Sequence, residues 1–183
     1  MANSRTKALS QQAYVRSTHV NHRMHMDMGF TKNCKYTFQL YMDDHTRESY
    51  LDVIKSKADT LSAWIVLKQA LENRHAPWRF AIIRTDGEWA YDNNAWTSHC
   101  KEEGIVHEFS SRHRHDQNGV IESGMRAIGG PFRSMMIQGN APEPDIPFAL
   151  RHSNVIRNNV PTKANNGRSP REKAAGMKLP PNK

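Results

Sequence analysis

The order of hydrophobic and polar residues along the chain predicts a domain in which strands and helices alternate. The stretch 23–28 alternates with the period of a strand, and two later runs rich in Tyr, Phe, Val and Ile predict a hairpin, because a polar turn joins them. Leu61, Trp64 and Leu71 recur at helical spacing, which predicts an amphipathic helix that packs on the sheet. The predicted strands are 23–28, 35–42, 48–55, 79–85 and 105–109, and the predicted helices are 58–74, 94–103, one that begins after residue 118, and 148–160.

Two stretches toward the C-terminus predict changes in this pattern. Gly129-Gly130-Pro131 should end or kink the third helix, because Pro lacks an amide hydrogen and collides with the preceding turn of a helix. Beyond Pro161 the chain is polar, basic and contains further prolines, so we expect an extended tail there. The residues of the last helix that should face the core are Ala149, Leu150, Val155 and Ile156.

Three acidic residues on separate predicted elements are candidates for a metal site. Asp27 lies on the first strand, Asp86 follows the apolar strand 79–85, and Glu122 lies at the start of the third helix. Mg²⁺ is a hard cation that takes oxygen ligands, and a pair of such ions requires several carboxylates around the substrate phosphate. The sequence therefore predicts a site for two Mg²⁺ ions at Asp27, Asp86 and Glu122.

Asp43 and Asp44 compete with Asp27 for the role of the first acid. Both lie in the polar turn of the predicted hairpin, where Asp side chains commonly bond to the local backbone. The turn explains these two acids, so Asp27 remains the predicted ligand.

The order Asp27, Asp86, Glu122, with Gln-Asn-Gly-Val-Ile-Glu at 117–122, resembles the catalytic core of retroviral and copia-type retrotransposon integrases, members of the RNase H-like superfamily. The resemblance spans about residues 23 to 180. It implies an α/β, RNase H-like fold, with a central mixed five-stranded sheet and helices on both faces. Further stretches that carry it are His-Met-Asp at 25–27, Lys-Tyr-Thr-Phe at 35–38, Tyr-Met-Asp-Asp-His-Thr-Arg at 41–47, Lys-Ser-Lys at 55–57 and Arg-Ser-Pro-Arg-Glu at 168–172.

The same resemblance implies an activity and partners. Such an integrase is a polynucleotidyl transferase with endonuclease activity, and its two Mg²⁺ or Mn²⁺ ions would be held by Asp27, Asp86 and Glu122. It carries out 3′-end processing of element DNA and strand transfer into target DNA, as a homodimer or higher oligomer. We expect no membrane partner, because no apolar run approaches the roughly 18 residues that span a bilayer. The implied location is the nucleus of the host cell, or a cytoplasmic element particle before entry.

Basic and polar residues next to Glu122 are candidates for contact with DNA. The predicted loop 110–118 is rich in Arg and His, which can meet phosphates, although a solvated polar turn is the alternative. Arg126 lies one turn after Glu122 on the same helix face, and by resemblance it reaches phosphate. The predicted DNA-binding residues are Arg112, Arg114 and His115 of this loop, Gln117 and Asn118 by resemblance, and Arg126.

Two departures from the family pattern leave other functions open. Gly-Glu-Trp follows Asp86, where family members commonly have Asn-Gly-Gly-Glu-Phe, and family members usually run straight through the region of 129–131. One alternative is therefore a catalytically inactive nucleic-acid-binding remnant of a retroelement. A second is an RNase H-type nuclease that cuts RNA in hybrids, since the same carboxylates would serve, although the stretch 117–122 argues against it.

Charge is distributed unevenly along the chain. Residues 1–26 carry four Lys or Arg and no acid, and residues 151–183 carry eight and one acid, so that the ends contribute +4 and +7 to a total of +8 and the middle contributes −3. Basic surfaces around metal-binding carboxylates suit a polyanion, while the alternative is a pair of solvated, disordered tails. The predicted organisation is a basic linker or disordered arm at 1–22, an integrase catalytic core at 23–160 and a basic C-terminal extension at 161–183.

His19, His22 and His25 raise the possibility of a structural zinc site. Such a site normally needs four ligands, and the only nearby cysteine is Cys34. Related integrases carry a His/Cys module upstream of the core, but its paired cysteines are missing here. We therefore expect that these histidines bind no structural metal.

Overall fold

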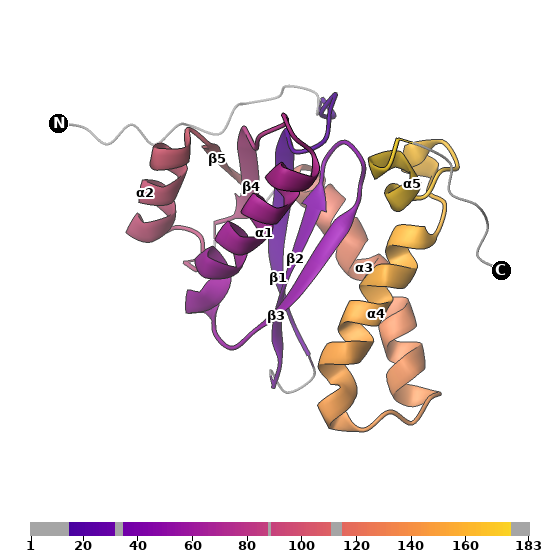
Figure 1. Ribbon diagram of the computed structural model, residues 1–183. Coiled ribbons are helices and arrows are strands. Elements are labelled where there is room, and N and C mark those ends of the chain that lie inside the picture. The colour runs from indigo at the N-terminus through magenta and orange to yellow at the C-terminus, as the bar shows by residue number, and fades with distance from the viewer. Residues whose placement is uncertain (1–14, 32–34, 88, 111–114, 177–183) are drawn as a thin grey trace.

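A five-stranded mixed sheet with helices on both faces forms the centre of the protein (Figure 1), which confirms the predicted architecture. The computed structural model describes residues 15–31, 35–87, 89–110 and 115–176, and at 115–118 the backbone alone. The strands are β1 (Arg23–Phe30), β2 (Thr37–Asp43), β3 (Ser49–Ile54), β4 (Ile82–Asp86) and β5 (Val106–Ser110), and the longer helices are α1 (Thr60–Arg74), α2 (Asn94–Glu103), α3 (His115–Ile137), α4 (Ile146–Asn159) and α5 (Pro170–Ala174).

The strand order in the sheet is β3-β2-β1-β4-β5. β1, β2 and β3 form an antiparallel meander, because short turns connect them. β4 pairs parallel to β1, and β5 pairs parallel to β4. A parallel neighbour needs a crossover connection, and here α1 makes the crossover from β3 to β4 and α2 the crossover from β4 to β5. The central strand β1 therefore has an antiparallel neighbour on one side and a parallel one on the other.

Alternation along the strands produces two apolar layers. On β1, Met24 and Met26 face α1 and α2, where they join a buried cluster with Trp64. On β2, Leu40 and Met42 face the opposite side, where they pack with Ile121 of α3. Successive side chains of a strand point to opposite faces, so the odd-numbered residues of β1 lie on the α3 side of the sheet.

The third helix does not end at Gly129-Gly130-Pro131, so that part of the prediction is wrong. Helix α3 continues through Pro131 to Ile137. Ile128 is buried, and Phe132 packs against the same apolar cluster on the other side of the proline. A proline inside a helix costs about 3 kcal/mol, whereas each large apolar side chain gains about 1.5–3 kcal/mol when it is buried. Packing on both sides of Pro131 can therefore offset the lost hydrogen bond.

The start of α3 also differs from the prediction. The stretch 110–118 was predicted to be a loop, but its last residues, from His115, already belong to the helix. At the other end of this stretch, Ser110 is the last residue of β5.

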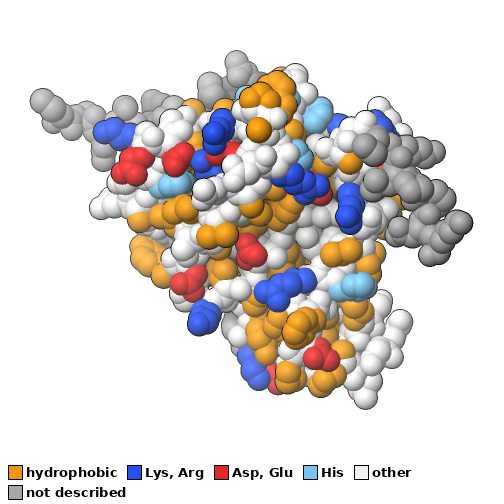
Figure 2. Space-filling model, in the orientation of Figure 1, with side chains coloured by type: hydrophobic (Ala, Val, Ile, Leu, Met, Phe, Trp, Pro, Cys, Tyr) orange, Lys and Arg blue, Asp and Glu red, His pale blue; other side chains and the backbone are white. Residues whose placement is uncertain are grey.

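One predicted inward face is partly wrong, because Val155 of α4 is 49% exposed. On α4, the buried face contains Ser153, Asn154 and Asn158 in addition to apolar residues, because these polar side chains bond to Ser49 and to the helix backbone. Figure 2 shows hydrophobic side chains gathered on the surface over the lower part of α4.

Residues 162–174 fold into a short bridge and a helix, α5. The expected extended chain beyond Pro161 is wrong for residues 162–174, where Thr162 bridges to Arg168 and α5 follows. The short helix suggested by Arg-Ser-Pro-Arg-Glu at 168–172 is found, with Ser169 as its N-cap and Glu172 completing a capping box.

Residues 15–22 form turns that bond to the rest of the protein, unlike a loose linker. The Ser17 N–H donates to Asp44 Oδ2 at 2.7 Å, and the Asn21 N–H donates to Asp43 Oδ2 at 2.9 Å. Residues 1–14 lie outside the described part, so the boundary at residue 22 stays a prediction. Within the described residues, no helix combines the length and the apolar character needed to cross a bilayer.

Gly29 allows a close contact between β1 and β2. A Cβ atom at this position would lie 2.1 Å from Cζ of Phe38, its register partner on β2. Phe38 is buried in the cluster under α3, so its ring has little room to move. Only glycine fits at Gly29 without displacing that ring.

We predict that Gly29→Ala lowers the free energy of unfolding by about 1–3 kcal/mol, because overpacking forces Phe38 off its position. Gly119→Ala is the matched control. A Cβ at Gly119 meets nothing within 4 Å, and Ala is a better helix former by up to about 1 kcal/mol, so stability should hold or rise. Urea unfolding of both variants followed by circular dichroism measures this, and equal stability of Gly29→Ala and the parent chain would contradict the prediction.

Candidate active site

The pairing of β1 with β4 brings two of the three predicted acids into neighbouring positions. The observed parallel pairs are Arg23 with Ile82, Met24 with Ile83 and His25 with Arg84, a constant difference of 84 − 25 = 59. Continued for two residues, the same register sets Asp27 opposite Asp86, since 27 + 59 = 86. Both acids lie toward the carboxyl ends of their strands, the edge where ligands bind in open α/β sheets.

The two acids also share one face of the sheet. Asp27 pairs with Leu40, whose side chain packs under α3, and it follows His25 at the two-residue period of a strand. Asp86 follows Arg84 in the same way, and Arg84 is the register partner of His25. Asp27 and Asp86 therefore both belong to the side of the sheet that α3 covers.

Glu122 reaches this side from α3. Its neighbour Ile121 is fully buried against β2, and Gly124 lies so close to the sheet that an added Cβ would be 2.1 Å from Cε of Met42. The Glu122 side chain is 34% exposed, with Arg126 Nη1 at 3.8 Å from its Oε2. Glu122 therefore lies at the margin of the α3 contact with the sheet, on the face that carries the two aspartates.

The donor chemistry fits divalent cations, but the acids are not drawn together. Carboxylate oxygens on one face are suitable ligands for Mg²⁺ or Mn²⁺. Among the residues that the structure describes, no three His, Cys, Asp or Glu side chains are grouped closely enough to hold a metal ion. Asp27 Oδ1 accepts a hydrogen bond from the Met28 N–H at 2.8 Å. The structure thus places the acids on a common face, and their use as a ligand set stays a prediction.

The predicted DNA-binding residues are only partly described. Arg112 and Arg114 lie outside the described residues, and so do the side chains of His115, Gln117 and Asn118, whose backbone forms the first turn of α3. Arg126 is described, and its side chain is 72% exposed. Its position one turn after Glu122 is the one that the sequence predicted.

Asp43 and Asp44 serve the turn between β2 and β3. Asp43 accepts hydrogen bonds from the Thr46 N–H at 2.7 Å and from the Asn21 N–H, and it is 1% exposed. Asp44 is fully buried and contacts Arg23, Arg47 and His25 at 3.0–3.5 Å. Burial raises the pKa of Asp44, while the Ser17 N–H and Arg47 act against the rise. Protein donors surround both carboxylates, which leaves them poorly placed to hold a metal ion.

The three histidines considered for zinc are used in different ways. His19 stacks on Trp78 with ring centroids 4.2 Å apart, and His22 Nδ1 lies 3.1 Å from Ser17 Oγ. His25 Nε2 lies 3.2 Å from Asp44 Oδ1. Burial lowers the pKa of His25 well below its ordinary value, and the neighbouring arginines lower it further. The His19 and His22 rings also lie near each other, with centroids 5.0 Å apart. That these histidines bind no structural metal stays a prediction.

A group of ion-paired side chains lies beside the acids, and the sequence did not predict it. Arg84 Nη2 lies 2.6 Å from Glu108 Oε2, and Arg23 Nη2 lies 3.5 Å from Glu108 Oε1. These side chains come from three adjacent strands and occupy the same face as Asp27 and Asp86. The signal in the sequence was the two-residue spacing of Arg84 and Asp86, but the partner on β5 depends on the sheet register.

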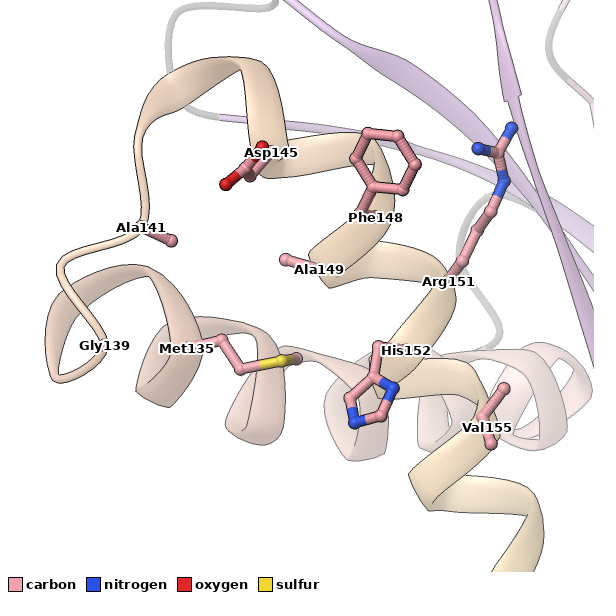
Figure 3. A pocket seen from close by; sticks show the side chains of 9 residues that line it. All are labelled: Met135, Gly139, Ala141, Asp145, Phe148, Ala149, Arg151, His152 and Val155. Carbon is pink, nitrogen blue, oxygen red and sulfur yellow. The ribbon is translucent and has the colours of Figure 1, made fainter.

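A cavity of about 760 Å³ lies away from the three acids, between the end of α3 and α4 (Figure 3). Met135 and His152 point toward one another across it, and Asp145 is the only carboxylate in its lining. Most of the lining is apolar. This cavity therefore offers no set of oxygen ligands like the one on the sheet. The lining residues are Met135, Gly139, Ala141, Asp145, Phe148, Ala149, Arg151, His152 and Val155.

Comparison with protein families and with known sequences gives a consistent result. The family model described as "Integrase core domain" matches residues 17–115, more than half of the 183-residue chain. The Retrovirus-related Pol polyprotein from transposon RE2 of Arabidopsis thaliana is 27% identical over 152 residues, which cover 82% of the chain and 10% of that polyprotein. The chain thus spans a tenth of the length of this relative.

Solved structures of integrases have the same fold. A simian T-cell lymphotropic virus intasome, in complex with PP2A regulatory subunit B56 gamma, aligns at a TM-score of 0.73 and 19% identity over 92% of this chain and 59% of the intasome chain. The HTLV-2 integrase catalytic core domain in complex with magnesium, in a trimeric form, aligns at 0.66 and 17% identity over 86% and 98%. The catalytic core domain of BIV integrase aligns at 0.65 and 18% identity over 85% and 95%. These similarities establish the RNase H-like fold of integrase catalytic cores.

The strand that follows α2 contains a histidine whose protonation should matter for stability. His107 Nε2 lies 2.9 Å from Thr85 Oγ1, next to Asp86, and the ring packs on Trp96 and Phe109. Burial lowers the pKa of His107 from 6.5 to about 4, against a small opposing effect of Asp92. The folded protein therefore holds a neutral imidazole over a pH range in which the unfolded chain binds a proton.

We predict that the contribution of His107 to stability is complete above pH 6.5 and is lost as the pH falls from 6.5 to about 4, by about 3 kcal/mol in all. His107→Gln keeps a polar atom near Thr85 but cannot be protonated, so its unfolding free energy should vary less with pH in this range. Denaturant unfolding at several pH values measures the slope. His152→Gln, at an exposed position, is the control and should keep the parent slope. Parallel pH profiles for His107→Gln and the parent chain would rule this out.

Proposed function

Because the chain belongs to the integrase core domain family, whose members are polynucleotidyl transferases, we propose that it is the catalytic core of a DNA integrase with Asp27, Asp86 and Glu122 as its metal-binding residues. The observation that carries the proposal is the parallel pairing of β1 with β4, whose register, continued two residues past the last observed pair of His25 with Arg84, would set Asp27 opposite Asp86. Glu122 faces the same region from α3, whose packing on β2 fixes its position. These three carboxylates, on three elements and one face of the sheet, would come together around the substrate phosphate only when metal ions are bound.

Two Mg²⁺ or Mn²⁺ ions are the proposed cofactors. Asp27, Asp86 and Glu122 would hold them. Such ions supply Lewis-acid stabilisation of charge on the phosphate and make the attacking oxygen more nucleophilic. One of the solved integrase cores with this fold was determined in complex with magnesium, which supports the choice of metal.

The proposed reactions are two displacements at phosphorus. In 3′-end processing, a water oxygen forms a bond to the phosphorus of element DNA, and the bond to the neighbouring 3′-oxygen breaks, which leaves a 3′-hydroxyl on the element. In strand transfer, that hydroxyl attacks a phosphodiester of target DNA, and the 3′-oxygen of the cut target strand departs. Arg126, exposed beside Glu122, would hold a phosphate group during both steps. Arg112, Arg114, His115, Gln117 and Asn118 are the other proposed DNA contacts.

Element-end DNA, target DNA and further copies of the chain are the proposed partners. The solved structures of similar fold include an intasome and a trimeric catalytic core, which supports an oligomer that acts on DNA. Sequence similarity to a transposon Pol polyprotein supports an origin in a retrotransposon. The corresponding location is the host nucleus, or a cytoplasmic element particle before entry.

The shortened turn after Asp86 favours one other candidate, an inactive nucleic-acid-binding remnant of a retroelement. The second reason for that candidate, an expected end of α3 at 129–131, is removed by the continuous helix. An RNase H-type nuclease would use the same three acids. Salt-sensitive DNA binding without any response to Mg²⁺ would favour the remnant, and cleavage of RNA in hybrids would favour the nuclease.

We predict that Asp27→Asn, Asp86→Asn and Glu122→Gln each reduce Mg²⁺-dependent joining of pre-processed element ends to a target duplex by at least about 100-fold, because each removes a metal ligand whose loss costs several kcal/mol of transition-state stabilisation. The measurement is a gel assay with labelled oligonucleotides in Mg²⁺ or Mn²⁺. Glu102→Gln, an exposed acid on α2, is the control and should keep full activity. DNA joining that persists in a variant with Asp27, Asp86 and Glu122 all replaced by Ala would show that the three acids are not the metal site.

A further inference from the structure

The segment after α4 forms a rigid surface at one end of the sheet. Asn165 Nδ2 donates to the Thr46 carbonyl at 2.7 Å, and Lys173 Nζ donates to the His45 carbonyl at 2.7 Å. Arg16 Nη2 donates to Asn165 Oδ1 at 2.6 Å, which adds the N-terminal part of the described chain. These bonds attach the segment to the turn between β2 and β3.

Five cations lie on this surface, which we call the basic end face. Lys163, Arg168 and Arg171 have exposed side chains, while Arg16 and Lys173 are partly buried beneath them. Figure 2 shows Lys and Arg side chains around the position that α5 has in Figure 1. The basic end face consists of Arg16, Lys163, Arg168, Arg171 and Lys173.

Few acids balance these cations. Glu172 is the only carboxylate between residues 161 and 176, and its Oε2 accepts a hydrogen bond from the Ser169 N–H at 2.8 Å in the cap of α5. Asp43 and Asp44 lie beneath the face, where they are 1% and 0% exposed, and they bond to the turn and to residues 17–23. The outer surface is therefore strongly positive.

Burial, and after it repulsion between neighbouring cations, lowers the pKa of two of these groups. For Lys173 burial acts first, then the charges of Arg16 and Arg47, while Asp43 raises the pKa and Arg168 lowers it by the smallest amount. The pKa of Arg16 is likewise lowered by burial and by Arg47. A bound polyanion would relieve this repulsion.

We propose that the basic end face binds the phosphate backbone of double-stranded DNA, independently of base sequence and of divalent metal. That the polyanion is DNA rests on the proposed function, but the site is separate from the three acids. Met24, at the start of β1, pairs with Asp43 of the supporting turn, whereas Asp27 lies three residues further along the strand. Hydrogen bonds of Asn165, Arg16 and Lys173 anchor the segment 162–174 to the turn between β2 and β3. The three exposed cations of this anchored segment are the ones available to meet phosphates.

The test is the salt dependence of DNA binding by the full chain in the presence of EDTA. Fluorescence anisotropy with a labelled 30-base-pair duplex would be recorded over a series of NaCl concentrations for K163E/R168E/R171E. Each lost phosphate contact changes the slope of log K against log salt by about 0.9, so three lost contacts should make the slope less negative by about 2.7. Affinity at low salt should fall at least about tenfold.

The matched control is K55E/K57E/K101E, which changes the net charge equally at three exposed lysines on other surfaces. It should keep a slope close to that of the parent chain. Thermal unfolding checks that each variant is folded, and K163Q/R168Q/R171Q, which removes the same contacts without adding acids, replaces the reversal variant if the latter does not fold. An unchanged slope in the folded triple variant, an equal loss in the control, or a preference for duplex RNA over duplex DNA would overturn the proposal.

This experiment also separates the proposal from the proposed catalysis. A variant with Asp27→Asn, Asp86→Asn and Glu122→Gln should keep the salt slope of the parent chain in EDTA, because the basic end face is intact. Loss of metal-dependent joining with normal slopes would leave the basic end face in place, and normal joining with an unchanged slope in K163E/R168E/R171E would reject the face alone.

Discussion

The hydrogen-bonded pairing of β1 with β4 is the constraint on which the candidate site depends. These strands are far apart in the sequence, and the helix α1 between them makes the crossover that parallel pairing requires. The observed register sets His25 opposite Arg84 and so leads Asp27 and Asp86, two residues further on, along the same face. A shift by one residue would move one of the acids to the opposite face of the sheet. The apolar layer under α1, with Met24, Met26 and Ile83, opposes such a shift because it would expose these buried side chains.

Buried charge at the turn between β2 and β3 connects the two ends of the described chain. Asp44 forms ion pairs with Arg23 of β1 and with Arg47 of its own turn, and it accepts a hydrogen bond from the Ser17 N–H of the N-terminal segment. Buried carboxylates are costly unless their partners are complete, and removal of one partner leaves an uncompensated charge. The carbonyl groups of His45 and Thr46 in the same turn accept hydrogen bonds from Lys173 and Asn165 of the C-terminal segment. The basic end face is thus built on a rigid support close to the strand that bears Asp27.

Helix α3 shows how packing outweighs a local sequence signal. Gly-Gly-Pro at 129–131 is unfavourable in a helix, yet Ile121 and Ile128 bury their side chains against β2 and against Leu150 of α4. Gly124 lies against Met42 and Leu40, so the helix approaches the sheet closely where Glu122 must be positioned. Because α3 is continuous, Glu122 lies on the same helix as Ile121 and Ile128, which pack against β2. The packing of these residues therefore positions Glu122.

The sequence by itself determined most of the element types, because strand and helix periods are local, and its order of motifs determined the fold class through the family resemblance. It also proposed the three acids, whose role stays a prediction. Asp27 could be chosen over Asp43 and Asp44 because turn chemistry explains the latter two. Only the tertiary structure decided which face of the sheet each acid occupies, that Arg84 meets Glu108, that Val155 is exposed, and that residues 162–174 fold back on a turn more than a hundred residues earlier. These features depend on strand register and on contacts between distant segments, and no local pattern of residues encodes such contacts.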